Sequence, residues 1–195
     1  TGSASAKFNT LSDYVALNNL SIMGQVNWVP NTSSNPQPII AFDNINGNGW
    51  IILGQSADNK LTLYQYVQST NYPYTTSLNV LAQTTGAITV SQTLNIGLAV
   101  NQNFAKIYLS QGNQTATTSS FPIVNSTYNL YFGNQYSPST FASLTSTLSN
   151  FSILTKYTDP ATYSNYGNVD NLTATFASSL ALSQNGTWTF SVPTS

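Results

Sequence analysis

The stretch Leu94–Gln114, LNIGLAVNQNFAKIYLSQGNQ, carries the clearest strand pattern in the chain. Apolar side chains occupy every second position from Leu94 to Val100, so one face of an extended segment is apolar. The polar turn NQN at 101–103 follows, and FAKIYL continues as a second strand. Two strands joined by a short polar turn predict an antiparallel hairpin that packs one face on a hydrophobic core.

Similar strand signals lie on both sides of this hairpin. They are LSIMGQVNWV, QPIIAF, GWIILGQ, NKLTLYQYV, YNLYFG and LSNFSIL. Segments rich in Asn, Gly, Ser and Pro separate them, which is typical of an antiparallel sandwich or barrel. Helix signals are sparse. The best is TDPATYSNY, where Asp159 as N-cap and Pro160 at the first helical position predict a short helix. The segment 110–120 is interpreted as a hairpin loop.

The order of these segments resembles the laminin G-like and concanavalin A-like jelly-roll family, in which two curved antiparallel sheets stack face to face. SDYVALNNLSIMGQVNWV is similar to the family's first strands, and LNIGLAVNQNFAKIYLSQGNQ to its central hairpin. YNLYFGNQYSPSTFASLTSTLSNFSILTKYTDPATYSNY resembles its closing block, although the usual Gly before the last strand is missing from TSTLSNF. The resemblance covers residues 6–166 and implies an all-β, antiparallel two-sheet jelly-roll sandwich.

A tail follows this region, so we expect two parts: a sandwich over residues 1–166 and a C-terminal β extension over 167–195. The tail has apolar residues at even positions, and QNGT predicts a hairpin turn at Asn185–Gly186. One interpretation makes the tail a donor strand that adds to the sheet of another copy. The other is a hairpin that enlarges its own sandwich. The candidate partner-binding residues are Leu172, Ala174, Phe176, Leu180, Leu182, Trp188, Phe190 and Val192.

The composition argues against most chemistry. Only 5% of residues are charged, against roughly a quarter in an average soluble protein. The chain has four Lys but no Arg, five Asp but no Glu, and neither His nor Cys. A basic patch for nucleic acid, the standard catalytic triads and the usual transition-metal sites are therefore excluded. Enzymes on this jelly roll typically use paired Glu residues, so we predict no enzyme and no cofactor. No segment is long and apolar enough to span a membrane.

Two Asx-rich segments bear on calcium, the ion commonly bound in the family that the chain resembles. Asp43, Asn44 and Asn46 lie in FDNING, and Asp58 and Asn59 lie in SADNK. A hard dication prefers several carboxylates, whereas Asx side chains in turns bond their own backbone. We therefore interpret both as turns and predict no metal site.

Two features of the sequence concern glycans. Tyr72 and Tyr74 in STNYPYTT are candidate contacts for a bound glycan, with a solvated aromatic loop as the alternative. Asn-X-Ser/Thr motifs are as numerous as so many Asn, Ser and Thr residues give by chance. The candidate glycosylation sites are Asn31, Asn113, Asn125 and Asn185.

Two functions fit this sequence. The first is a structural, self-assembling subunit of an extracellular filament or virion surface fibre, of archaeal or viral origin, whose partner is a second copy added strand to strand. The net charge of −1 removes self-repulsion and favours association. The alternative is a secreted, lectin-like adhesion domain that binds surface glycans. Both place the chain outside the cell.

Overall fold

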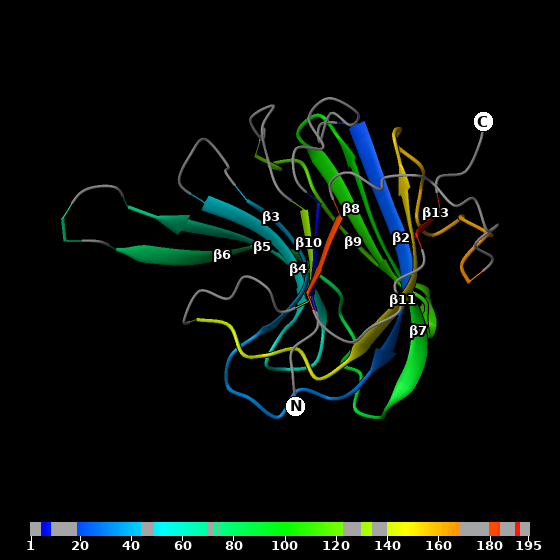
Figure 1. The fold of residues 1–195 in the computed structure, drawn as a ribbon, viewed down its shortest axis with the longest axis horizontal. Coiled ribbons are helices and arrows are strands. Elements are labelled where there is room, and N and C mark those ends of the chain that lie inside the picture. The colour runs from blue at the N-terminus through cyan, green and yellow to red at the C-terminus, as the bar shows by residue number, and fades with distance from the viewer. Residues whose placement is uncertain are drawn as a thin grey trace.

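The computed structural model describes residues 5–8, 19–43, 49–69, 72–73, 75–122, 130–133, 140–167, 180–183 and 190–191. Over these residues two β-sheets pack face to face as a jelly-roll sandwich (Figure 1). All strand pairs are antiparallel except one short parallel pair at the C-terminus. The predicted fold class is confirmed.

The first sheet has seven strands in the described part of the chain. In spatial order they are β12 (Leu180–Ser183), β1 (Ser5–Phe8), β10 (Leu130–Gly133), β3 (Gln37–Asp43), β4 (Gly49–Gln55), β5 (Leu61–Gln68) and β6 (Thr76–Gln83). The second sheet has six. In spatial order they are β13 (Phe190–Ser191), β11 (Thr147–Leu154), β2 (Asn19–Trp28), β7 (Gln92–Asn101), β8 (Phe104–Leu109) and β9 (Gln114–Thr118).

The predicted central hairpin is β7–β8, with Asn101 opposite Phe104 at the turn. The other predicted strand segments form β2, β3, β4, β5, β10 and β11. Segment 110–120 is not only a loop, because it holds the 3₁₀ turn η3 (Gln111–Asn113) and β9, which pairs with β8. Its sequence, QTATT, has a single apolar residue and gives little period-2 signal.

The predicted helix in TDPATYSNY is wrong. Asp159 does cap this segment, since its Oδ1 accepts a hydrogen bond of 2.9 Å from the Ala161 amide. Only one turn follows, closed by the bond from the Thr162 amide to the Asp159 carbonyl. The chain then runs along the second sheet, where burying the Tyr166 ring takes the place of further helical turns.

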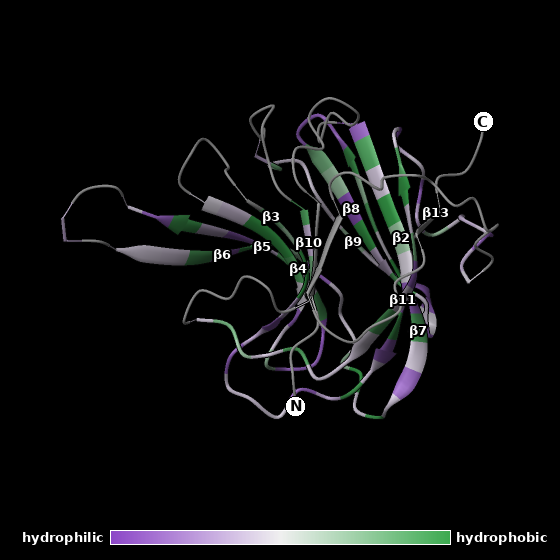
Figure 2. Cartoon of the chain, viewed as in Figure 1, coloured by the Kyte–Doolittle hydropathy of each residue, from purple (hydrophilic) through white to green (hydrophobic). Residues whose placement is uncertain are grey.

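The core lies between the sheets. Figure 2 shows hydrophobic and hydrophilic residues alternating along the strands, as expected when one face of each sheet is buried. The largest fully buried side chains include Trp28, Phe42 and Phe132. The rings of Phe132 and Phe151 connect the two sheets, with centroids 4.9 Å apart. In β11 the bulge at Asn150, with φ of 53°, provides a left-handed residue near the site of the family's missing Gly.

The tail pairs within its own chain. β12 lies antiparallel to β1 in the seven-stranded sheet, and β13 lies parallel to β11 in the six-stranded sheet. The hairpin predicted around Asn185–Gly186 is therefore wrong: the strands on either side of it join different sheets, although residues 184–189 themselves lie outside the described residues. The boundary at 166/167 stays a prediction.

Candidate functional site

The outer face of the seven-stranded sheet, which points away from the core, carries a cluster of aromatic rings. On β5, Leu61 and Leu63 face the core, so Tyr64 and Tyr66 face outward on the same side as Trp50 of β4. Tyr131 of β10 and Phe141 of the segment 140–146 complete the group, which we call the aromatic face. A solvent-facing side of an antiparallel sheet usually carries polar residues, so the aromatic face is unusual.

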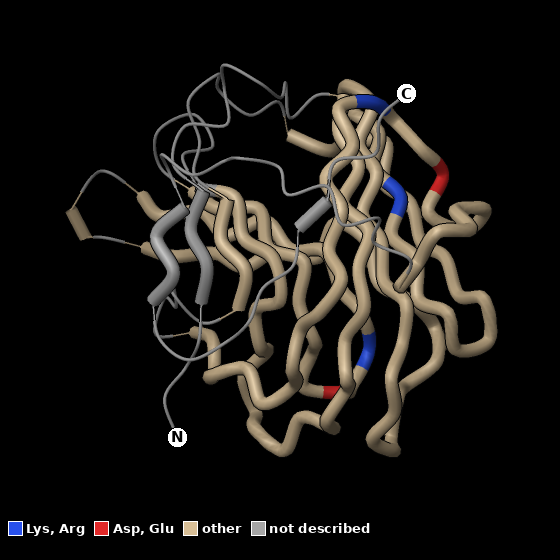
Figure 3. Tube along the Cα trace, turned by 45° about the vertical axis from the view of Figure 1, so that its right-hand side comes forward, with Lys and Arg blue, Asp and Glu red and all other residues tan. Residues whose placement is uncertain are grey.

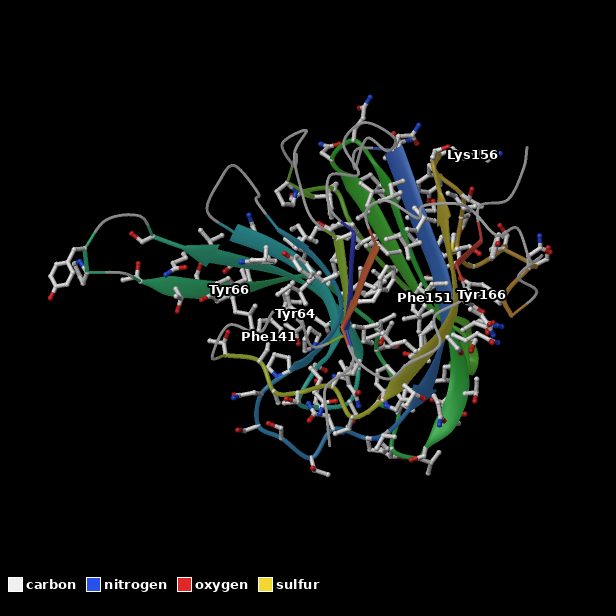
Figure 4. The ribbon with its side chains drawn as sticks, in the orientation of Figure 1. Tyr64, Tyr66, Phe141, Phe151, Lys156 and Tyr166 are labelled. Atoms are coloured by element: carbon white, nitrogen blue, oxygen red, sulfur yellow. The ribbon has the colours of Figure 1, made fainter. Side chains whose placement is uncertain are left out.

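Segment 140–146 covers part of the aromatic face. The Phe141 ring meets Tyr64 edge-on, with centroids 6.0 Å apart and planes at 86° (Figure 4). Trp50 contacts Tyr131 with centroids 5.7 Å apart. The Ala142 amide donates to the Pro36 carbonyl at 2.8 Å, which holds the segment against the loop that precedes β3. Tyr64, Tyr66 and Phe141 are buried, whereas Trp50 is half-buried and within reach of a ligand.

Polar groups flank the aromatic face at the end nearest the β4–β5 turn. The Gln83 amide donates to the Thr62 hydroxyl at 2.9 Å, beside Tyr64. Burial raises the pKa of Tyr64 to about 12, so its hydroxyl stays a neutral donor at physiological pH. The hydrogen bond from Lys60, then that from Ser56, holds the pKa of Asp58 below its ordinary value. Hydroxyl, amide and carboxylate groups thus lie next to a surface of aromatic rings.

The hairpin β5–β6 forms one edge of this sheet and extends beyond the other strands (Figure 1). The connection between its strands carries a candidate glycan-binding residue. Tyr72 is 87% exposed. Tyr74, the other candidate, lies outside the described residues. β5 therefore leads from Tyr64 and Tyr66 on the sheet toward an aromatic residue presented to solvent.

The outer face of the six-stranded sheet is covered by residues 155–167, which we call the strap. The Ser21 hydroxyl donates to the Lys156 carbonyl at 2.9 Å and accepts from the Thr158 amide at 2.8 Å. Lys106 of β8 forms an ion pair of 2.7 Å with Asp159. Partial burial opposes ionisation, but hydrogen bonds from Lys106 and the Ala161 amide hold the pKa of Asp159 below its ordinary value. The strap is therefore held by polar bonds.

The strap also depends on a glycine in β7. A Cβ built on Gly97 would overlap the Pro160 ring and lie 2.7 Å from the Tyr166 hydroxyl oxygen. That hydroxyl donates to the Pro160 carbonyl at 2.9 Å. Burial raises the pKa of Tyr166, so the donor keeps its proton. The strap approaches the sheet this closely because Gly97 has no side chain.

The candidate ion sites are turns where the structure describes them. Asn59 Oδ1 accepts from Gln55 Nε2 at 2.8 Å and also from the Asn31 amide. Asp58 is engaged by Ser56 and Lys60. No group of three or more acidic, His or Cys residues gathers anywhere in the described part of the chain. The side chain of Asp43, and Asn44 and Asn46, lie outside it.

The predicted glycosylation sites differ in their surroundings. Asn31 is buried, and its Nδ2 donates to the Asn35 carbonyl at 2.8 Å and to the Ser56 carbonyl at 3.3 Å. An attached glycan would replace one of the two Nδ2 hydrogens and so remove at least one of these bonds; glycosylation of Asn31 stays a prediction that its burial disfavours. Asn113 is exposed beside β9. Asn125 and Asn185 lie outside the described residues.

The predicted donor strand is described only in part. Leu180 and Leu182 lie in β12, and Phe190 lies in β13. The remaining candidates lie outside the described residues, namely Leu172, Ala174, Phe176, Trp188 and Val192. Strand addition to another copy stays a prediction.

Sequence reasoning did not identify the aromatic face. The segment NKLTLYQYV contains the signal. Leu61 and Leu63 lie on one face of the strand, and Tyr64 and Tyr66 lie on the other. A strand with apolar side chains on both faces is expected to be covered on both sides of the sheet. Phe141 could not be found this way, because it belongs to an irregular segment.

The sequence matches no protein-family model, and no curated protein matches it. Solved structures do match. A native heptameric SAP-like pentraxin from Limulus polyphemus is similar, with a TM-score of 0.51, 11% identity and coverage of 81% of this chain and 72% of that chain. The chain has a laminin G-like, concanavalin A-like jelly-roll fold.

Two further matches to this jelly roll have lower scores. Carbohydrate binding module CBM66 from Bacillus subtilis has a TM-score of 0.47 and 10% identity, and the match covers 78% of this chain and 83% of that chain. Domains LG4-5 of the mouse laminin alpha1 chain have a TM-score of 0.47 and 9% identity, with coverage of 77% and 39%. Fold likeness at these identities does not decide catalysis, so the absence of enzymatic activity stays a prediction. No helix in the described residues is long and apolar enough to cross a membrane.

Proposed function

We propose that the jelly roll is an extracellular, lectin-like adhesion module that binds a neutral glycan along the hairpin β5–β6. The observation that carries the proposal is a pair of aromatic side chains, the half-buried Trp50 on the aromatic face and the 87% exposed Tyr72 at the tip of the hairpin. Aromatic rings stack on the apolar faces of sugar rings, and flanking hydroxyl and amide groups bond the sugar hydroxyls.

The charges favour a neutral glycan over an acidic one. Figure 3 shows the charged residues as a few isolated positions. Of the three lysines with described side chains, Lys60 and Lys106 are each held in an ion pair with an aspartate. An anionic polysaccharide would find little unpaired positive charge on the described surface to offset its own charge.

The test is affinity electrophoresis through gels that contain a neutral soluble polysaccharide or alginate. A panel of neutral β-glucans, mannans and galactans is used as the probe set. We expect at least one neutral polysaccharide to retard the protein, and Tyr72→Ala and Trp50→Ala to reduce the retardation at least several-fold. Tyr163→Ala, a half-buried tyrosine on the opposite face, is the matched control. No retardation by any neutral member, or retardation by alginate alone, contradicts the proposal.

A second candidate function, self-assembly by strand addition, is favoured by the outer edge of β6. Among the described residues β6 pairs only with β5. The bond from the Ser69 amide to the Thr75 carbonyl marks a hydrogen-bonded pair. Alternation then directs the backbone groups of Thr76, Leu78 and Val80 away from β5. Val80 is 56% exposed and β6 has no charge or proline, the usual protections of an edge.

In this second candidate the tail of one copy, with its alternating residues Leu172 to Leu182, gives up the pairing of β12 with its own β1 and adds instead to β6 of the next copy. Light scattering at rising concentration tests it. Growth of long particles that Val80→Lys and truncation after Gly167 both abolish supports self-assembly. A full chain that stays monomeric at high concentration eliminates it and leaves the adhesion module as the only candidate.

A further inference from the structure

Asn113 occupies a turn that presents its side-chain nitrogen to solvent. It ends the 3₁₀ turn between β8 and β9, with a left-handed φ of 49° next to Gly112 at 69°. Its Oδ1 accepts a hydrogen bond of 3.2 Å from the Tyr108 hydroxyl, and its Nδ2 takes no part in a hydrogen bond among the described residues. The amide is therefore oriented by its oxygen while its nitrogen stays accessible.

The hydroxyl of the same Asn-X-Ser/Thr motif is also accessible. Thr115 lies on β9 directly opposite Tyr108, and both Thr115 and Asn113 are exposed. The acceptor asparagine and the motif's hydroxyl thus lie on the surface at a short, irregular connection. The Asn113 amide donates to the Ser110 carbonyl at 3.1 Å and Gln114 Nε2 donates to the Gln111 carbonyl at 3.1 Å, so the turn holds Asn113 in place without using its Nδ2.

The other motifs that the structure describes lack this combination. Asn31 is buried with both Nδ2 bonds in use. The Asn19 motif ends in Ser21, which is fully buried and bonded to the strap. Asn150 donates its Nδ2 to Gln25 at 2.7 Å, and its motif ends in the buried Ser152. Chance explains how many motifs there are, but it does not explain which one the fold leaves accessible.

We propose that Asn113 is an N-glycosylation acceptor. Its Nδ2 attacks the anomeric carbon of a lipid-linked oligosaccharide, a nitrogen–carbon bond forms, the carbon–oxygen bond to the lipid phosphate breaks, and one amide proton leaves. No electron is transferred to or from an outside agent. The product keeps Oδ1 and one N–H, so the bond from the Tyr108 hydroxyl persists. The glycan extends from the β8–β9 connection into solvent, and the fold is unchanged.

To test this, the full chain is secreted from a eukaryotic cell line and digested with chymotrypsin. Chymotrypsin does not cleave before Pro122, so cleavage after Leu109 and Tyr128 releases Ser110–Tyr128, which contains the motifs of Asn113 and Asn125. Cleavage after Trp28 and Phe42 releases Val29–Phe42, which contains only that of Asn31. Treatment with peptide N-glycosidase in ¹⁸O water converts a glycosylated asparagine to labelled aspartate. Tandem mass spectrometry locates the label within each peptide, and we expect it at Asn113 in most copies of Ser110–Tyr128 and nowhere in Val29–Phe42.

Matched variants separate modification from folding. Thr115→Val keeps the shape and the strand preference of an exposed residue and should lose the label at Asn113 completely, whereas Thr115→Ser should keep it. The melting temperature of each variant is compared with that of the enzymatically deglycosylated wild type, and the two should agree. A wild-type Ser110–Tyr128 peptide without label at Asn113 overturns the proposal, as does a label at Asn113 that survives Thr115→Val.

Discussion

The two outer faces of the sandwich are covered in different ways. On the seven-stranded sheet, segment 140–146 buries the Phe141 ring against Tyr64 and its neighbours. On the six-stranded sheet, the strap is fixed by Ser21, by the Lys106–Asp159 pair and by its close approach at Gly97. The first cover is a small second core, whereas the second combines polar bonds and an ion pair with the packing of aromatic rings.

The difference determines how each cover responds to its surroundings. Burial of aromatic area does not depend on the protonation of side chains, and salt does not screen it. A hydrogen bond exchanged with water contributes about 1 kcal/mol, and an exposed ion pair contributes less and is screened by salt. We therefore expect the aromatic cover to stay in place over a wide range of pH and the strap to be the first of the two to loosen.

The largest expected effect comes from Phe141→Ala. Truncating a buried phenylalanine removes its transfer free energy and leaves a cavity, which together cost about 3 kcal/mol. Urea unfolding measures the loss, and Ser143→Ala, an exposed change in the same segment, serves as the control. A loss below about 1 kcal/mol would mean that segment 140–146 is not packed on the aromatic face.

Gly97→Ala tests the strap from the side of the sheet. The added Cβ overlaps Pro160 and crowds Met23 Sδ at 2.9 Å, so the strap must move, at a cost of about 1–3 kcal/mol. We expect faster trypsin cleavage after Lys156, which lies in the strap, measured by the decay of the intact chain. Thr93→Ala, an exposed change on the same strand, should leave the rate unchanged. Equal cleavage rates for the wild type, Gly97→Ala and Thr93→Ala would contradict the close approach of the strap to Gly97.

Tyr166→Phe removes one hydrogen bond from the strap and keeps its ring. The Pro160 carbonyl loses its donor, so the free energy of unfolding should fall by about 1 kcal/mol. The ring contact with Tyr108, with centroids 6.0 Å apart, is kept, which makes Tyr166→Ala the harsher comparison. If Tyr166→Phe costs as much as Tyr166→Ala, the hydroxyl rather than the ring holds this end of the strap.

Asp159→Asn has the smallest expected effect and the clearest pH dependence. The substitution keeps an oxygen for the Ala161 amide but loses the charge that pairs with Lys106, which costs about 0.2–1 kcal/mol near neutral pH. Because the folded pKa of Asp159 is lowered, its contribution is present above the ordinary value of 3.8 and is lost as pH falls through the folded pKa. The wild type and variant should therefore converge below that value and in molar salt. A difference in unfolding free energy that persists there would assign the effect to packing.

Much of the fold could be predicted from local patterns. Strands such as β2 and β7 have long alternating apolar faces, and these faces specify both the strand and the side that meets the core. The sequences of β6 and β9 carry little strand signal, because an edge strand pairs on one side only and needs fewer apolar side chains to bury. The helix predicted at Asp159 shows the limit of capping signals: the cap is present, but the chain beyond it follows the sheet.

By itself, the sequence determined the all-β class, the core faces of the long strands and the absence of residues for most metal and triad chemistry. These depend on composition and on the period of neighbouring residues, which are local properties. Only the tertiary structure decided that Phe141 would meet Tyr64, that the tail strands would join different sheets, and that Asn31 would be buried while Asn113 is exposed. Each of these outcomes depends on contacts between segments far apart in the chain, and the period of a single segment carries no information about its distant neighbours.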